Sequence, residues 1–491
     1  MDEISTVRED VEHTTDKQTS KNNQSTLLKG HSPFLVHSTR NRLVWKALYF
    51  TLPLLILTVI PMVAYYINYP WIERSPDTIS YLLVVERSQV RPDLLVNPVR
   101  VPGYPLFIRF VYMLEGRGNL AAVSDLQAIL FILMVLEIYL IALLVFRRVW
   151  LAFLVGLLVG TNLILVSYIK PIMPEGLAAF LLTTLALTVV CFVLTPRVWK
   201  VWPITLLLLL LTFTRPEWVY LPSLLLGYLL FVVIRRRGRR QLVQYGIHAV
   251  LSLILIYLCV GAYIERNSIQ NHYQIFTSVV NFNLMGKVLQ YGMENEVPPK
   301  EKPISRVLDK CIARIGRNPY HVLPCVPALS GLYGAPAGEF AKSIMLNHSA
   351  EFFFKSWPLF FSSLTDYFDV PYHQGTPPGP FHTPLSWLKT FHQVLYLLNA
   401  YFPTCVLVWL FLLCRRQTAS WQEGLAMGAI TLVVVYGIII TTLGGYTAYD
   451  YMRFHIVFYP LLILAIWGSF LRVLIYLFST NSSQVRRETN S

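Results

Sequence analysis

The chain has 491 residues, of which 55% are hydrophobic and only 14% are charged, and its mean hydropathy is +0.50. This composition excludes a soluble globular protein, because so much apolar surface with so little charge would not stay dispersed in water. The formal net charge is +14. The basic residues cluster at the ends of apolar runs, which is typical of cytoplasmic loops between membrane spans and argues against nucleic-acid binding.

Residues 1–44 are polar and rich in Ser, Thr, Asn and Gln, which predicts a disordered cytoplasmic tail and not a cleavable signal. The first apolar run follows Arg40, Arg42 and Lys46, so we expect a signal anchor. The apolar runs lack polar–apolar alternation and therefore predict transmembrane helices and not barrel strands. We expect about ten spans, at residues 48–66, 126–146, 151–168, 176–194, 201–213, 218–234, 247–263, 388–413, 425–442 and 456–478.

Ten spans that start from a cytoplasmic tail place every basic short loop on the cytoplasmic side, together with both termini. The expected fold class is an all-α polytopic membrane protein with amphipathic helices and a small, mostly helical extracytoplasmic region. Within that region, the aromatic-rich segment 351–364 predicts a helix lying on the membrane surface. The expected parts are the tail 1–44, helices one to seven at 45–265 with a first outer loop at 67–124, the outer region 266–385, helices eight to ten at 386–478, and a cytoplasmic tail at 479–491.

The six cysteines fall into two groups. Four of them belong to apolar runs and are expected to act as small hydrophobic side chains: Cys191, Cys259, Cys405 and Cys414. Cys311 and Cys325 fall in the outer region, where they either form a disulfide or remain two unpaired thiols. A disulfide requires their Cα atoms to lie within about 7 Å of each other.

The first outer loop contains the sequence WIERSPDTISY at residues 71–81. Pro76 followed by Asp77 predicts a helix start, and Tyr81 lies one turn after Asp77. Asp77 either caps this helix or is a carboxylate at the mouth of the bundle that serves as a general base.

A second segment, RVPGYPLF at residues 100–107, places two prolines around Gly103 and Tyr104. This pattern predicts a tight bend before an apolar run. The bend is either a purely structural corner or a rigid corner at which Arg100 holds an anion.

The sequence KPIMPEG at residues 170–176 forms a short outer turn between two predicted spans. Charged side chains at this depth are costly and often functional. Interfacial snorkelling is an alternative explanation, and it suits Lys170 better than Glu175.

Two further outer segments carry arginines. In TRPEW at residues 214–218, Arg215 and Glu217 either satisfy each other or contribute to a site. In YTAYDYMRFH at residues 446–455, Arg453 stands at the outer end of a span, against the positive-inside preference. We therefore expect a compensating negative charge, supplied by Asp450 or by a phosphate.

These segments all fall on the non-cytoplasmic side, so we expect their side chains to form one pocket. Carboxylates suit a hydroxyl group and cations suit a phosphate. The expected catalytic residues are Asp77 and Glu175, and the expected substrate-binding residues are Arg100, Tyr104, Lys170, Arg215, Arg453, Tyr81 and His455.

Taken together, the first-loop aspartate, the Pro-Gly-Tyr-Pro corner, the glutamate after the third span and the arginine before the last span resemble the GT-C class of membrane glycosyltransferases. Within that class the chain is most similar to the protein O-mannosyltransferases and the lipid A aminoarabinose transferase, of glycosyltransferase family 39. The resemblance covers residues 45–478. It implies that Asp77 is the catalytic aspartate, Glu175 the second acidic residue, and that Arg100 and Arg453 lie near the lipid phosphate.

The chain departs from the mannosyltransferases in two ways. Thr78 follows Asp77 where those enzymes have an Asp-Glu pair, and no MIR-like module follows. Protein O-mannosylation is therefore not expected.

The resemblance implies a transferase that moves a sugar from a polyprenyl-phosphate donor to a glycan, lipid or protein acceptor. It would act on the outer face of a bacterial plasma membrane or the lumenal face of the endoplasmic reticulum. One displacement with Asp77 as the base would invert the anomeric centre. No cofactor is expected, and no metal is indicated, because His348, His373 and His382 lack ligand spacing.

Two alternatives stand beside the transferase. The first is a multi-pass transporter or flippase of a lipid-linked or anionic substrate, because intramembrane charges and broken helices also mark transport paths. The second is a non-catalytic assembly or polymer-ligating protein. A site near the midplane would favour transport, and a site at one interface would favour the enzyme.

Overall fold

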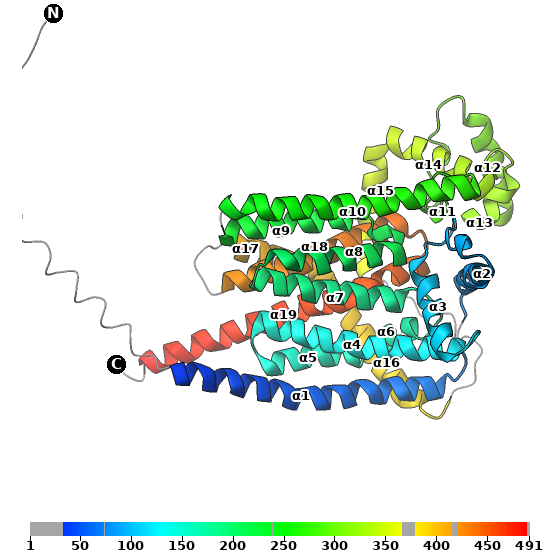
Figure 1. Cartoon of the computed structure of the whole chain (residues 1–491). Helices are drawn as coiled ribbons and strands as arrows, with labels where there is room; N and C mark the ends of the chain where they lie inside the picture. Colours follow the sequence, from blue (N-terminus) through cyan, green and yellow to red (C-terminus); the bar gives the residue numbers. More distant parts are fainter. Residues whose placement is uncertain (1–32, 73, 238, 366–378, 415–419, 489–491) are drawn as a thin grey trace, which may run out of the picture. The chain divides into compact units, whose positions relative to one another are not determined.

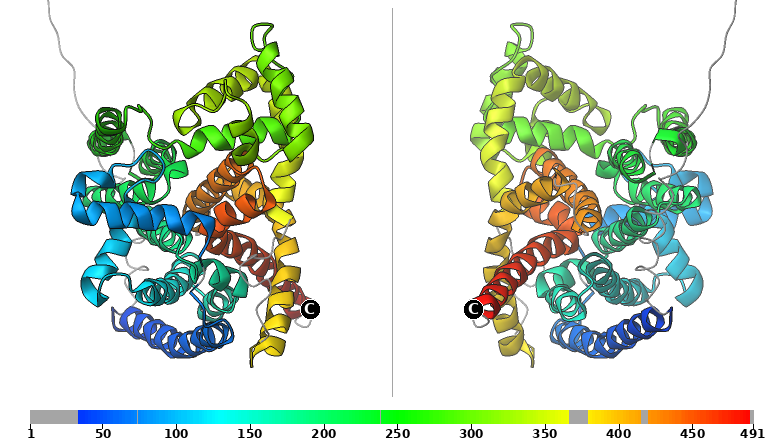
Figure 2. Two further views of the ribbon diagram at one scale, coloured as in Figure 1. Left: turned by 90° about the vertical axis from the view of Figure 1, so that its right-hand side faces the viewer. Right: turned by 90° about the vertical axis from the view of Figure 1, so that its left-hand side faces the viewer.

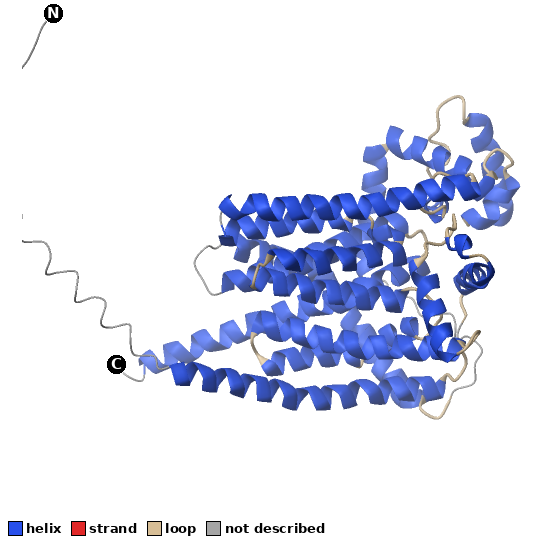
Figure 3. Ribbon diagram, in the orientation of Figure 1, coloured by secondary structure: helices blue, strands red, loops and turns tan. Residues whose placement is uncertain are grey.

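The computed structural model describes residues 33–488 except residues 73, 238, 366–378 and 415–419. The described residues form α-helices and short 3-10 helices, and no strand occurs among them (Figure 3). The predicted all-α class is therefore confirmed. The chain divides into two units, Met1–Phe50 and Thr51–Ser491, and the packing below is that of the second unit.

Eight helical segments of the described residues are long and apolar enough to cross a membrane. They are Ala47–Asn68, Leu120–Phe146, Glu175–Leu194, Pro216–Arg236, Gln241–Asn271, His382–Leu410, Trp421–Gly444 and Asp450–Leu471. Each corresponds to one of the ten predicted spans. The first helix, α1 (Pro33–Asn68), begins inside the predicted tail, where Pro33 suits a first helical turn and three apolar residues follow it.

Two predicted spans differ from a single straight helix. The third consists of α5 (Val149–Gly160) and α6 (Leu163–Ile169), which meet at an angle of 51°. The side chain of Asn162 caps α6 by accepting hydrogen bonds from the next turn, which satisfies backbone groups that the break would otherwise leave unpaired. The fifth is α8 (Val201–Thr214), which is shorter than the roughly 20 residues of a full span.

The core of the bundle lies where α4 (Leu120–Phe146) packs against α5 and α7 (Glu175–Leu194), and α7 packs against α18 (Ser420–Gly444) and α19 (Ala448–Glu488). These helices run side by side (Figure 1). Seen along the bundle, α19 starts in its middle and runs toward the edge at which the C-terminus lies (Figure 2). Two helices of the first outer loop, α2 (Pro76–Val90) and α3 (Gly103–Glu115), lie at one end of the bundle.

The outer region has a small core of its own at the same end of the bundle. Its helices are α11 (Val279–Gln290), α12 (Lys302–Ile315), α13 (Pro319–Val322), α14 (Ala335–Asn347) and α15 (Ser349–Thr365). Cys311 and Cys325 form a disulfide with Cα atoms 6.1 Å apart, which confirms the first of the two interpretations.

Helix α15 covers the predicted aromatic segment. Its side chains Phe353, Phe354 and Trp357 are all more than half exposed. An exposed aromatic face on a helix next to a membrane span fits the expected contact with lipid headgroups. The position of α15 on a membrane surface stays a prediction.

The sidedness of the bundle is also a prediction, with a direct test. Helices α4 and α9 (Leu221–Arg237) start at the end that carries α2 and α3 and run away from it (Figure 1). We expect cysteines introduced as Arg147→Cys and Arg235→Cys to resist a membrane-impermeant thiol reagent in intact cells. Arg117→Cys and Ser330→Cys, exposed in the outer loops, should react. Labelling of the cysteine at position 235 from outside would contradict this topology. The basic residues at 415 and 416 lie outside the described residues.

Candidate active site

Helix α2 begins as predicted, but Asp77 does not cap it. Ser75 is the N-cap residue: its Oγ accepts a hydrogen bond from the Thr78 backbone N–H at 3.2 Å, and Thr78 Oγ1 accepts one from the Ser75 N–H at 2.9 Å. Thr78 Oγ1 also donates to the Ile172 carbonyl at 2.9 Å, which ties α2 to the turn before α7. The capping interpretation of Asp77 is therefore wrong, because the capping box is complete without it.

The Asp77 carboxylate instead lies between two arginines. Arg100 Nη2 donates to Asp77 Oδ1 at 2.5 Å, and Arg453 Nη1 lies 2.7 Å from Asp77 Oδ2. Burial alone would raise the pKa of the Asp77 carboxyl, but the guanidinium groups of Arg453 and Arg100 outweigh it and hold the pKa well below its ordinary value. Asp77 is therefore ionised across the neutral pH range.

Local structure fixes Arg100 in place. The Asn97 side chain accepts hydrogen bonds from the Val99 and Arg100 backbone N–H groups at 2.8 and 3.0 Å, which turns the chain before α3. Arg100 Nε donates to Ser80 Oγ at 2.7 Å, and the guanidinium carbon lies 4.6 Å from the centroid of the Tyr81 ring. Helix α2 thus presents Asp77, Ser80 and Tyr81 to one arginine, as residues one turn apart on a helix can.

The predicted corner at residues 100–107 positions Arg100. Its tyrosine, Tyr104, does not line the site. Tyr104 is fully buried, and its hydroxyl donates to Gln127 Oε1 at 2.7 Å. Its ring meets that of Tyr81 edge to face, with centroids 5.1 Å apart. A Cβ atom on Gly103 would overlap the Phe213 carbonyl at the end of α8, so only glycine permits this close approach. Tyr104 therefore supports Tyr81 from behind.

Glu175, the first residue of α7, is fully buried between two arginines. Its Oε1 accepts a hydrogen bond from Arg453 Nε at 2.8 Å and lies 3.0 Å from Arg215 Nη1. Arg215 also forms an ion pair with Glu217. Among the described residues, Glu175 Oε2 has no hydrogen-bond partner.

The structure thus brings one chain of ion pairs together from five segments of the sequence. It links α2, the turn before α3, the start of α7, the turn after α8 and the start of α19. Three carboxylates face three guanidinium groups: Asp77, Glu175, Glu217, Arg100, Arg215 and Arg453. Such a balanced network is stable in a low dielectric only while each member keeps its partners.

A cavity of about 1320 Å³ opens against this network. Asp77, Arg100, Arg215 and Arg453 line it directly, whereas Glu175 lies behind the two arginines that it contacts. The remaining wall is mostly apolar or aromatic. It comes largely from the segment 274–278, α11, α13, η3 (Pro216–Trp218) and the linker between α18 and α19. The cavity therefore has charged side chains on one side and mostly apolar side chains on the others. This is the usual composition of a small-molecule site.

Besides Tyr104, two further residues expected to bind substrate lie elsewhere. Lys170 is buried with its Nζ 5.1 Å from the Tyr66 ring centroid, and His455 is buried with Nδ1 3.0 Å from the Ser363 carbonyl. Neither lines the cavity. His455 follows Arg453 by two positions, which places the two side chains on different faces of α19.

The predicted counter-charge for Arg453 also needs a correction. Asp450 lines the cavity, but its carboxylate accepts a hydrogen bond from Thr447 Oγ1 at 2.6 Å and does not form the ion pair with Arg453. Asp77 and Glu175 form the ion pairs with Arg453, and Asp450 interacts with it only at longer range.

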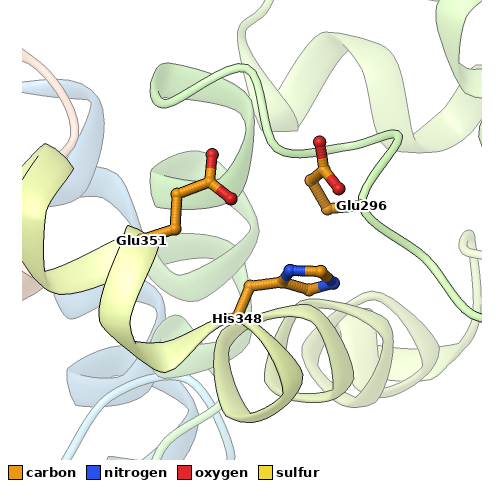
Figure 4. Close-up of side chains that lie close together, drawn as sticks. All are labelled: Glu296, His348 and Glu351. Carbon is orange, nitrogen blue, oxygen red and sulfur yellow. The ribbon is translucent and has the colours of Figure 1, made fainter.

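One group of possible metal ligands occurs outside the cavity (Figure 4). Glu296, His348 and Glu351 place their ligand atoms within 4.8 Å of one another, although His348 looked isolated in the sequence. Glu351 already forms an ion pair with Lys355 at 2.7 Å, and the group is partly exposed. None of the three residues lines the cavity, and His373 lies outside the described residues.

Sequence reasoning missed the aromatic part of the cavity wall. Tyr320 follows Asn318 and Pro319 at the start of α13, and it lines the cavity together with Phe282 of α11. The Asn-Pro pair was a helix-start signal, but the residues are far from the charged segments in sequence.

No protein-family model matches the chain, and no curated protein matches it significantly. Among solved structures, the chain is similar to the archaeal oligosaccharyltransferase AglB from Archaeoglobus fulgidus in complex with an inhibitory peptide and a dolichol-phosphate. The identity is 12%, the match covers 90% of this chain and 52% of that one, and the TM-score is 0.47. A second match is the Archaeoglobus fulgidus oligosaccharyltransferase tethered to an acceptor peptide with the NVT sequon, with 12% identity, 85% and 49% coverage and a TM-score of 0.43. The chain spans about half the length of these proteins.

Proposed function

We propose that the chain is a membrane glycosyltransferase of the GT-C class. It would move a sugar from a polyprenyl-phosphate donor to an acceptor hydroxyl on the non-cytoplasmic face. The observation that carries this proposal is the Asp77 carboxylate in the cavity wall, held between Arg100 and Arg453. The sequence resemblance to the GT-C class, which rests on the same residues, supports it.

Transfer of a sugar from a lipid phosphate requires a base that accepts the proton of the acceptor hydroxyl. It also requires positive charge that stabilises the leaving phosphate. The bond between the anomeric carbon and the phosphate oxygen breaks, and the phosphate leaves with the electron pair. Arg453 and Arg100 stabilise that charge. The acceptor oxygen attacks the anomeric carbon from the opposite side and gives its proton to Asp77. A single displacement of this kind inverts the anomeric centre.

Donor binding would also change the basicity of Asp77, because it disturbs the ion pairs that Asp77 forms with Arg100 and Arg453. With two guanidinium groups on its carboxylate, Asp77 is a weak base, because its pKa is strongly lowered. A donor phosphate competes for the same arginines, which bind phosphate through paired hydrogen bonds. Once they move to the phosphate, the pKa of Asp77 rises toward its ordinary value and its basicity increases.

Glu175 is a positioning residue in this proposal and does not touch the substrate. It is fully buried and fixes both Arg215 and Arg453 from behind the cavity wall. This role differs from the catalytic role expected from the sequence.

The position of the network favours the enzyme over a transporter. Glu175 opens α7, Arg215 follows the end of α8, and Arg453 lies in the first turns of α19. The charges therefore sit at helix ends, at one side of the bundle, whereas a transporter site is expected near the midplane.

Replacing Arg453 with alanine is expected to weaken donor binding. Loss of one charge-assisted contact to the phosphate should raise the donor KM about 10- to 100-fold. KM rises because the donor phosphate is already charged in the ground state, and kcat should also fall because the leaving phosphate gains further negative charge in the transition state. The donor is identified first, by headgroup analysis of the lipid-linked sugars that accumulate in cells lacking the protein.

The matched control is Arg91→Ala. Arg91 is an exposed arginine of the same outer loop, paired with Asp93 outside the cavity, and its loss should leave the donor KM within twofold. An Arg453→Ala enzyme with an unchanged donor KM would rule out a phosphate contact for Arg453.

A further inference from the structure

The wall of the cavity that belongs to the outer region is aromatic. Phe282 of α11, Tyr320 of α13 and Tyr446 of the α18–α19 linker all line it. The rings of Phe282 and Tyr320 are stacked, with centroids 4.9 Å apart and planes inclined by 11°. The Tyr446 ring lies beside them, 6.5 Å from Tyr320.

Tyr320 is only half covered by these neighbours. Its side chain is 48% exposed although Phe282 covers one face of the ring. Asp77 and Arg100 both act electrostatically on its hydroxyl. Tyr320 lines the same cavity as Asp77, Arg100 and Arg453.

The stacked pair is held rigidly by its backbone. Asn318 Oδ1 accepts a hydrogen bond from the Tyr320 N–H at 3.0 Å, which fixes the start of α13. A Cβ atom on Gly286 would overlap the Tyr446 ring, so α11 presses directly against that ring. Preformed rings of this kind bind a ligand at low cost in conformational entropy.

The chemistry of this chamber matches a sugar ring more closely than a lipid tail or a bare phosphate. A pyranose has a flat face of C–H groups and an edge of hydroxyls. The C–H groups carry partial positive charge and suit the negative face of an aromatic ring. The hydroxyls suit carboxylates and guanidinium groups such as those of Asp77, Asp450 and Arg100. A lipid tail would form no hydrogen bonds with these polar groups, and a phosphate alone would not use the rings.

We infer that the stacked Phe282–Tyr320 pair is the platform on which the transferred sugar lies, and that this sugar is a pyranose with a flat face of C–H groups. Gluco- and galacto-configured rings meet this requirement, and furanoses do not. This inference rests on the proposed function and adds the class of sugar to it. It assigns Tyr320 as a residue that determines specificity.

The inference is tested by saturation-transfer NMR on the purified full-length protein. The probes are methyl β-D-glucopyranoside and methyl β-D-galactopyranoside, with methyl β-D-ribofuranoside as the comparison of ring size. We expect saturation of the pyranoside ring protons with the wild type and with Tyr320→Phe. With Tyr320→Ala the effect should fall about 2- to 10-fold, and the donor KM should rise by a similar factor.

Tyr401→Ala is the matched control, because Tyr401 is an exposed aromatic residue outside the cavity, and it should behave as the wild type. Equal melting temperatures of the variants exclude misfolding as the cause. Three results would overturn the platform: no saturation of either pyranoside in the wild type, undiminished saturation in Tyr320→Ala, or equal saturation of the furanoside. A Tyr320→Ala enzyme with wild-type kinetics would leave the proposed function standing, whereas that function fails if Asp77→Asn transfers sugar normally.

Discussion

Asp77→Asn is expected to reduce sugar transfer by about 100- to 10,000-fold while the protein stays folded in the membrane. Asparagine keeps the shape of the side chain but cannot accept the proton of the acceptor hydroxyl. The start of α2 is unaffected, because Ser75 and Thr78 cap it. In this variant Arg453 still donates a hydrogen bond to Glu175. Arg100 still donates to Ser80 and contacts the Tyr81 ring, so neither arginine is left without contacts.

The measurement is the initial rate of transfer from the native lipid-linked donor in reconstituted vesicles. Asp93→Asn provides the matched control: Asp93 is a carboxylate of the same outer loop, paired with Arg91 outside the cavity, and its variant should transfer within twofold of the wild type. Asp77→Asn activity above one tenth of the wild-type rate would show that Asp77 is not the base.

Glu175→Gln is expected to lower the free energy of unfolding by about 3–5 kcal/mol, which is typical when one partner of a buried ion pair is removed. Glu175 is fully buried and accepts from Arg453, with Arg215 also at ion-pair distance. Glutamine keeps the volume but leaves the two guanidinium groups with less negative charge nearby. The loss is measured as the difference in unfolding free energy in detergent, and transfer activity should fall with it because Arg453 is released.

A matched control is available on the surface of the same protein. Glu339 pairs with Lys342 in an exposed ion pair on α14, and Glu339→Gln should change the unfolding free energy by less than about 1 kcal/mol. The double variant Glu175→Gln with Arg215→Gln should recover part of the stability, because it removes a positive charge that Glu175 no longer balances. Equal stabilities of Glu175→Gln and Glu339→Gln would contradict a structural role for the buried network.

The sequence by itself determined eight of the ten predicted membrane spans, the helix start at Pro76 and the need for a counter-charge at Arg453. Each of these rests on local chemistry. An apolar run must be helical in lipid, a proline suits a first turn, and an arginine at the outer end of a span requires compensation. The sequence also made Cys311 and Cys325 candidates for a disulfide, because both fall in the outer region, but it left two unpaired thiols as the alternative.

Only the tertiary structure decided which groups meet. Arg453 pairs with Glu175, 278 residues away in sequence, and with Asp77, not with the nearby Asp450. Such a choice depends on how α2, α7 and α19 pack, and no local pattern encodes that packing. The helical periodicity of α19 likewise places His455 away from the cavity, although Arg453, two positions earlier, lines it. Tyr320 lines the cavity because the outer region lies at the same end of the bundle. Contacts between such distant segments are fixed by burial of apolar surface and not by sequence spacing.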